Sequence, residues 1–130
     1  MIHLSRREFT RLVRQAYRHV PPPVKSALRN LDIAVEDWPD PGDLESMGIS
    51  GGVSGEVTGT LFGLYTGVPL PEREGPEPAL PDRITIFRQP ILWSCSSRSE
   101  AEREIRVTLW HEIGHYLGMS EEDLERLGYG

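Results

Sequence analysis

Residues 99–121 read SEAEREIRVTLWHEIGHYLGMSE, and this stretch decides how the rest of the chain is organised. Apolar residues recur in it at the three- and four-residue spacing of a helix, so we expect one helix over about 99–117. Its apolar face is formed by Ile105, Leu109, Ile113, Tyr116 and Leu117. His111 and His115 fall nearly opposite that face, with Glu112 at its flank. The pattern predicts a helix that packs its apolar face on a sheet and holds both imidazoles away from it.

The two histidines stand one helical turn apart, one above the other on the same side of the helix. Both imidazoles can therefore reach one metal ion, and zinc takes nitrogen ligands at about 2.0–2.1 Å. Glu112 follows His111 directly, where its carboxylate can exchange a proton with water beside the metal without being a ligand. The alternative is a pair of exposed surface histidines. The spacing of His111 and His115, with Glu112 beside them, favours a site for one zinc ion.

A third ligand is needed, because catalytic zinc sites take three protein ligands and leave one position for water. Gly118 falls where a helix requires a left-handed residue to end, so the chain can reverse there. Glu121 would then reach the metal, and a carboxylate is an acceptable ligand for zinc. Glu122, Asp123 and Glu125 remain as alternatives, because acidic residues are also favoured in the first turn of a helix.

Two helices are expected near the N-terminus. Ser5 and Glu8 form a capping box that opens the first, which carries apolar residues on one side and arginines 7, 11, 14 and 18 on the other. The proline run 21–23 ends this helix and can start a short one over 24–29. Ser120, with an acidic residue three positions later, caps a last short helix.

Alternating apolar and polar residues predict strands over about 31–35, 60–66 and 84–88. The segment 67–81 is rich in proline and acidic residues and predicts a loop. The chain is therefore expected to form a single α+β domain over residues 1–130. A small mixed sheet of about three strands should pack against the long C-terminal helix.

The charges are distributed unevenly along the chain. It carries 14 Lys and Arg against 20 Asp and Glu, for a net charge of −6. Residues 1–30 hold seven of the basic residues and one acidic residue, whereas 31–130 hold seven and nineteen. This acidic body argues against nucleic acid as the main partner. The basic N-terminal segment could touch RNA, an acidic partner or a membrane surface, but a solvated arginine face is the simpler interpretation.

The single cysteine, Cys95, excludes an internal disulfide framework and fits a reducing compartment. No histidine pattern accompanies it, so we expect a half-buried structural thiol. No apolar run has the length of a membrane span and no signal peptide is evident, which makes the cytoplasm the default location. His3 and His19 lie far from the motif in sequence and are expected to be ordinary surface residues.

The segment HEIGHYLGMSE (111–121) resembles the metzincin-type zinc signature HExxHxxGxx(H/D) and is most similar to the small bacterial zincin-like metallopeptidases. LFGLYTGVPLPER (61–73) and PDRITIFRQPI (81–91) extend the resemblance upstream. It implies a compact zincin fold, zinc held by His111, His115 and position 121, and Glu112 as the catalytic acid and base. Position 121 is Glu here where these relatives have Asp, so its carboxylate reaches one methylene further.

The resemblance implies a peptidase that hydrolyses peptide bonds of peptide or protein substrates. From the charge distribution and the lack of a long apolar run we expect it to be intracellular, with no nucleic acid or membrane partner. One alternative is a zinc-binding protein of the same fold with little turnover, acting through protein contacts. Another is a nonproteolytic hydrolase, for example one that matures RNA. A glutamate at position 112 favours an enzyme, because binding alone needs no proton shuttle. The oligomeric state is left open.

A substrate cleft should border the zinc site. We expect a peptide to pair with an exposed sheet edge there, and the strand ITIFR (84–88) is the candidate. The loop 67–81 could flank the cleft. Tyr65 and Tyr129 are candidate donors to the tetrahedral intermediate, although most tyrosines are packing residues.

Overall fold

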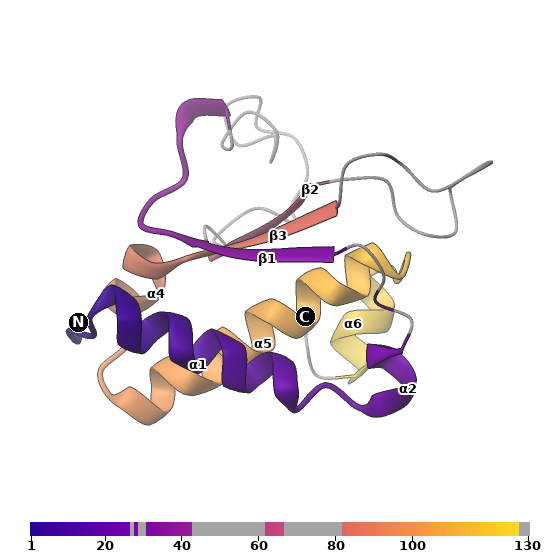
Figure 1. Ribbon diagram of the computed structural model, residues 1–130, viewed down its shortest axis with the longest axis horizontal. Helices are drawn as coiled ribbons and strands as arrows, with labels where there is room; N and C mark the ends of the chain where they lie inside the picture. Colours follow the sequence, from indigo (N-terminus) through magenta and orange to yellow (C-terminus); the bar gives the residue numbers. More distant parts are fainter. Residues whose placement is uncertain (27, 29–30, 43–61, 67–81, 128–130) are drawn as a thin grey trace.

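The computed structural model describes residues 1–26, 28, 31–42, 62–66 and 82–127, and in these a small sheet lies over a layer of helices (Figure 1). The helices are α1 (Arg6–Arg18), α2 (Pro22–Lys25), α4 (Arg88–Ser94), α5 (Arg98–Tyr116) and α6 (Glu121–Leu127). The strands are β1 (Leu31–Glu36), β2 (Gly63–Thr66) and β3 (Asp82–Phe87). The predicted α+β class, with three strands and a long C-terminal helix, is confirmed.

The sheet is mixed and its order is β1-β3-β2. Strand β3 pairs with β1 in parallel, with Ile33 opposite Ile84, and with β2 antiparallel, with Gly63 opposite Ile86. Each predicted strand overlaps an observed one, although residues 60–61 lie outside the described part of the chain. Because β3 is the central strand, the prediction that 84–88 form an exposed edge is wrong. Among the described strands, the outer edges belong to β1 and β2.

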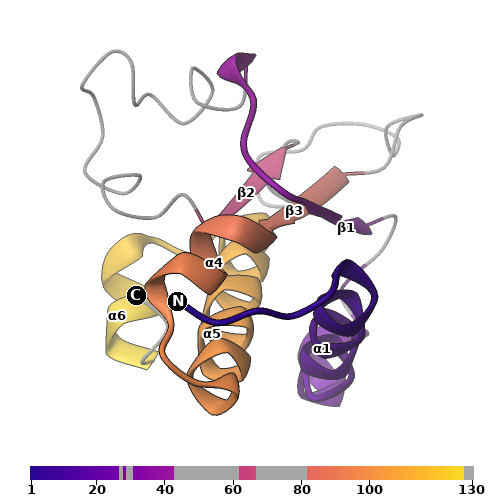
Figure 2. The ribbon, with the colours of Figure 1, turned by 90° about the vertical axis from the view of Figure 1, so that its left-hand side faces the viewer.

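The core lies between the sheet and the two long helices. Figure 2 shows α1 and α5 side by side beneath the strands, and α5 contacts α1, β2 and β3. Phe9 and Leu12 of α1 meet Ile105 and Leu109 of α5 in one apolar cluster, which also includes Ile84 of β3. Burial of these side chains, each worth about 1.5–3 kcal/mol, fixes the long helix under the sheet.

The helix ends follow the capping residues that the sequence shows. Ser5 accepts a hydrogen bond from the backbone N–H of Glu8 at 3.1 Å, and Ser97 accepts one from Glu100 at 3.2 Å. Helix α2 starts earlier than predicted, because Pro22 occupies a first-turn position that needs no N–H donor. Helix α4 was not predicted; it begins at Arg88, the residue at which the third strand was expected to end.

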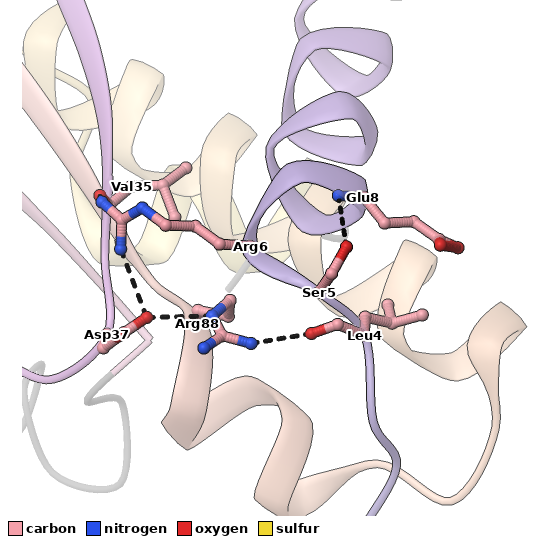
Figure 3. Close-up of polar contacts among 7 residues, drawn as sticks. All are labelled: Leu4, Ser5, Arg6, Glu8, Val35, Asp37 and Arg88. Carbon is pink, nitrogen blue, oxygen red and sulfur yellow. Dashed lines mark hydrogen bonds and ion pairs between the residues drawn. The ribbon is translucent and has the colours of Figure 1, made fainter.

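The start of α4 is tied to β1 and to the N-terminal segment by Arg88, whose side chain is 15% exposed. Its Nε donates to Oδ1 of Asp37 at 2.9 Å, and its Nη1 donates to the backbone carbonyl of Leu4 at 2.7 Å (Figure 3). Arg6 approaches the same carboxylate oxygen at 3.3 Å. Two guanidinium groups thus converge on Asp37 and connect three segments that are distant in sequence.

Cys95 is fully buried, with 0% exposure, rather than half-buried as expected. It follows α4 directly and lies in the core cluster. Its thiol is thereby removed from solvent, which fits a structural role. None of the described helices is long and apolar enough to cross a membrane.

Candidate metal centre

His111 and His115 lie in the C-terminal half of α5, one turn apart, and each is half-buried. Their ring centroids are 4.6 Å apart and the ring planes meet at 73°. The helix fixes this arrangement, because a four-residue spacing brings side chains to the same side of the axis. The sequence therefore placed the two imidazoles together correctly.

Glu112 completes the group. Its Oε1 lies 3.2 Å from Nδ1 of His115. His111, Glu112 and His115 each offer one atom that could bind a metal ion, and these three atoms lie within 4.8 Å of one another. With the proton on Nδ1, His115 donates to Glu112 and carries its lone pair on Nε2, the form in which an imidazole binds a metal.

The burial of Glu112 differs from the prediction. Its side chain was expected at the flank of the helix, but it is 8% exposed and Thr108, one turn earlier, is also 8% exposed. The buried face of α5 thus extends past the apolar residues to these two polar ones. As a consequence His111 and His115 border the buried face instead of lying opposite to it.

The close approach of β2 explains this burial. A β-carbon added to Gly63 would lie 2.7 Å from Cγ2 of Thr108 and 3.4 Å from Cγ of Glu112. A residue with a side chain would therefore hold the strand away from the helix. Sequence reasoning missed Gly63. A glycine in a strand can indicate that another element packs closely against the strand, but the sequence does not say which element that is.

The chain reverses just after the histidines, as predicted. Gly118 has a φ of 82°, and it donates to the carbonyl of His115 at 3.0 Å. Met119 donates to the carbonyl of Gly114 at 2.8 Å. These two bonds form a Schellman motif, which ends the helix and turns the chain back toward it.

The structure describes the side chains of three of the four candidates for the third ligand. Asp123 forms the cap of α6: its N–H donates to Oγ of Ser120 at 3.1 Å, and its Oδ2 accepts from the N–H of Ser120 at 3.3 Å. It also pairs with Arg126. Glu122 and Glu125 are exposed. Glu121 is the first residue of α6, and its side chain lies outside the described part of the chain.

Tyr65 lies beside the site but its hydroxyl is engaged. It donates to Oδ2 of Asp82 at 2.8 Å, and the Asp82 carboxylate is buried. The Tyr65 ring meets the ring of Tyr116 edge-on at 5.9 Å. Because Tyr116 follows His115, this contact supports the end of the helix that carries the imidazoles. The Tyr65 hydroxyl thus has a partner in Asp82, which sequence reasoning missed.

Other predicted residues lie away from the centre or outside the described chain. His3 and His19 are exposed, and Nδ1 of His19 lies 2.8 Å from the carbonyl of Gln15 at the end of α1. They are surface residues, as expected. Tyr129 and the loop 67–81 lie outside the described residues.

The sequence model of the zincin-like metallopeptidases matches residues 28–130. The chain belongs to the zincin-like metallopeptidase family. The match includes all three described strands and α5 with His111, Glu112 and His115, and it begins after α1 and α2. No curated protein matches the chain. Family membership thus agrees with the resemblance seen in the motif 111–121.

Proposed function

We propose that this zincin-like protein is a zinc-dependent peptidase that uses His111 and His115 as metal ligands and Glu112 as general base and acid. One observation supports this above the others: donor atoms of these three residues gather within 4.8 Å on the long helix of a chain from this family. Peptides or proteins are the proposed substrates. The site is expected to hold one zinc ion.

The donor set fits zinc. Two imidazoles on one helix present nitrogen atoms from a rigid support, and zinc in hydrolases is commonly held by two histidines and a carboxylate. Bound zinc would supply a Lewis acid that makes water nucleophilic near neutral pH and polarises a carbonyl. The protein supplies the remaining functions with its own side chains.

Glu112 would move the proton. Its carboxylate takes a proton from the attacking water and then gives it to the nitrogen of the leaving amine. Burial between α5 and β2 restricts its rotamers, so the carboxylate stays near the two imidazoles. The contact with His115 orients that carboxylate further.

Glu121 is proposed as the third protein ligand. It stands three residues after Gly118, where the chain reverses, whereas Asp123 is used in the cap of α6. Replacing a residue that only orients a metal ligand lowers metal affinity about 10–100-fold. Replacing a ligand itself should cost at least as much, so Glu121→Gln should lower the affinity for zinc by about 10-fold or more. Glu125→Gln on the same short helix is the matched control. Equal affinities of these two variants for zinc, measured by competition with a chelating dye, would exclude Glu121.

The substrate is proposed to lie along β2. This strand is an edge of the described sheet, and its Gly63 lies against Glu112. An extended peptide that pairs with this edge would pass beside the carboxylate. Strand β2 therefore replaces the central strand β3 as the candidate for substrate pairing.

Metal analysis and a cleavage assay test the proposal together. Purified parent should contain close to one zinc per chain, and His111→Ala close to none. A fluorogenic peptide library should then be cleaved by the parent but not by Glu112→Gln, which keeps the shape of the side chain and should keep the zinc. Equal zinc in the parent and His111→Ala, or unchanged cleavage by Glu112→Gln, would reject the site.

A second candidate is a zinc-binding protein with little turnover. The burial of Glu112 favours this candidate. Its side chain is 8% exposed and contacts His115, so its carboxylate is less available to take a proton from water. In this case zinc would be bound at full occupancy and would raise the melting temperature. Any cleavage of library peptides would then be equally fast with the parent and with Glu112→Gln.

A further inference from the structure

Helix α1 carries a face of exposed arginines that the zinc site does not use. Arg7, Arg11, Arg14 and Arg18 recur at helical spacing and all are exposed. None forms an ion pair with a described acidic residue, whereas Arg6 of the same helix pairs with Asp37. The family match begins after this helix. The face is therefore a positively charged surface with no acidic partner in the described part of the chain.

A groove lies beside this face, between α1 and the edge strand β1. Its volume is about 680 Å³. Val13 of α1 and Ile33 of β1 contribute apolar surface to it, Arg14 and Arg18 line it, and none of the described residues that line it is acidic. Figure 2 shows α1 below β1, on the side of the sheet away from β2. The groove thus combines apolar walls with positive charge.

Strand β1 also presents backbone groups to the groove. Its inner edge pairs with β3. The carbonyl of Val35 instead accepts a hydrogen bond from Arg6, so it points away from β3 (Figure 3). Backbone direction alternates along a strand, so Leu31 and Ile33 turn their N–H and carbonyl groups to the same outer edge. An outer edge of this kind can pair with a further strand.

We propose that this groove binds an extended acidic peptide segment of another protein, which adds to β1 as a strand. Its backbone would pair with Leu31 and Ile33, and every second side chain would face the groove, where apolar side chains would meet Val13 and carboxylates would meet Arg14 and Arg18. The surface lies across the sheet from the zinc site, because β1 and β2 are opposite edges. Binding here does not depend on the proposed peptidase activity.

The chemistry of the groove favours such a peptide over other partners. A second copy paired through β1 would bring two arginine faces together, and like charges repel. RNA or an anionic membrane would use the arginines but would leave the apolar walls and the strand edge without a role. An acidic extended peptide would use the arginines, the apolar walls and the strand edge together.

Fluorescence anisotropy with a defined probe tests the proposal. The probe is a fluorescein-labelled peptide of six residues, the length of β1, with the sequence Ser-Glu-Ser-Val-Ser-Glu, so that Val and both Glu lie on one face of the strand. We expect saturable binding to the full chain with a Kd below about 1 mM that weakens with added salt. The peptide with Gln in place of each Glu, and the peptide methylated on every second backbone nitrogen, should bind markedly more weakly.

Two double variants separate the groove from general charge attraction. Arg14→Ala/Arg18→Ala removes two arginines that line the groove, and Arg7→Ala/Arg11→Ala removes two on the same helix that do not line it. The first should weaken binding roughly five- to tenfold and the second should have a smaller effect. Circular dichroism should show both variants folded, because alanine is a strong helix former.

Several results would overturn the proposal. Equal weakening by the two double variants would show general charge attraction. No saturable binding, or equal binding of the methylated peptide, would exclude strand addition. Tighter binding of oligouridylate or of vesicles containing anionic lipid would assign the surface to RNA or to a membrane. A concentration-dependent dimer that blocks the probe would assign it to a second copy.

Discussion

Gly63 of β2 faces Thr108 of α5 so closely that a β-carbon on the glycine would lie 2.7 Å from Cγ2 of the threonine. The backbone carbonyl oxygen of Thr85 would lie 3.3 Å from the same β-carbon. We expect Gly63→Ala to lower the free energy of unfolding by about 1–3 kcal/mol, because strand and helix must move apart. Denaturant unfolding followed by circular dichroism measures the change.

A double-mutant cycle identifies the contact responsible. Thr108→Ser removes Cγ2 and keeps the hydroxyl, so Gly63→Ala should be less harmful in that background. A coupling of at least about 0.5 kcal/mol is expected, since the residues touch. Strictly additive effects would show that the loss has another cause.

Gly118 should tolerate asparagine better than alanine. Its φ of 82° lies in the left-handed region, which costs an L-residue about 1–2 kcal/mol. We expect Gly118→Ala to lower the free energy of unfolding by about that amount and Gly118→Asn by less, because asparagine adopts this region more readily. If urea unfolding gave both variants the stability of the parent, the Schellman motif would not govern this helix end.

The stability of the protein should fall in acid, partly through Asp37. The hydrogen bond from Arg88 holds the pKa of Asp37 below its usual value of 3.8. Because the folded pKa lies below the unfolded one, the stabilisation is complete above a pH of about 5 and is lost as the pH falls through the unfolded and then the folded pKa. The Asp37 side chain is 47% exposed, so the effect should not exceed about 1 kcal/mol.

Urea unfolding of the parent and of Asp37→Asn across this acid range measures the contribution. The slope of stability against pH should be shallower in the variant but not flat. Asp123 contributes in the same direction, because hydrogen bonds from Ser120 lower the pKa of that carboxyl. Identical slopes in the parent and Asp37→Asn would contradict the prediction.

Cys95 should not react in the folded protein. Burial raises the pKa of its thiol, and the residue is 0% exposed, so both the thiolate fraction and access are reduced. Ellman's reagent at pH 8 should label it far more slowly than free cysteine. Labelling should become complete in denaturant. Rapid labelling without denaturant would mean that α4 opens readily.

The sequence alone determined the local features. Ser5 and Ser120 were predicted as caps and mark helix starts that the structure has, because a capping hydroxyl acts within three residues of its own position. The convergence of His111 and His115 was also predictable, since helical spacing fixes it. Gly118 likewise predicted the chain reversal, because a left-handed residue ends a helix through hydrogen bonds to nearby residues of that helix.

Only the tertiary structure decided which strand borders the site and how deep the glutamate lies. The spacing of Glu112 placed it at the flank of the helix, but the approach of Gly63 encloses it. The sequence also suggested 84–88 as an edge, whereas β3 pairs on both sides. Strand order and interlayer distance depend on contacts between residues far apart in the chain. Local spacing carries no information about such contacts, so they are fixed only when sheet and helix pack together.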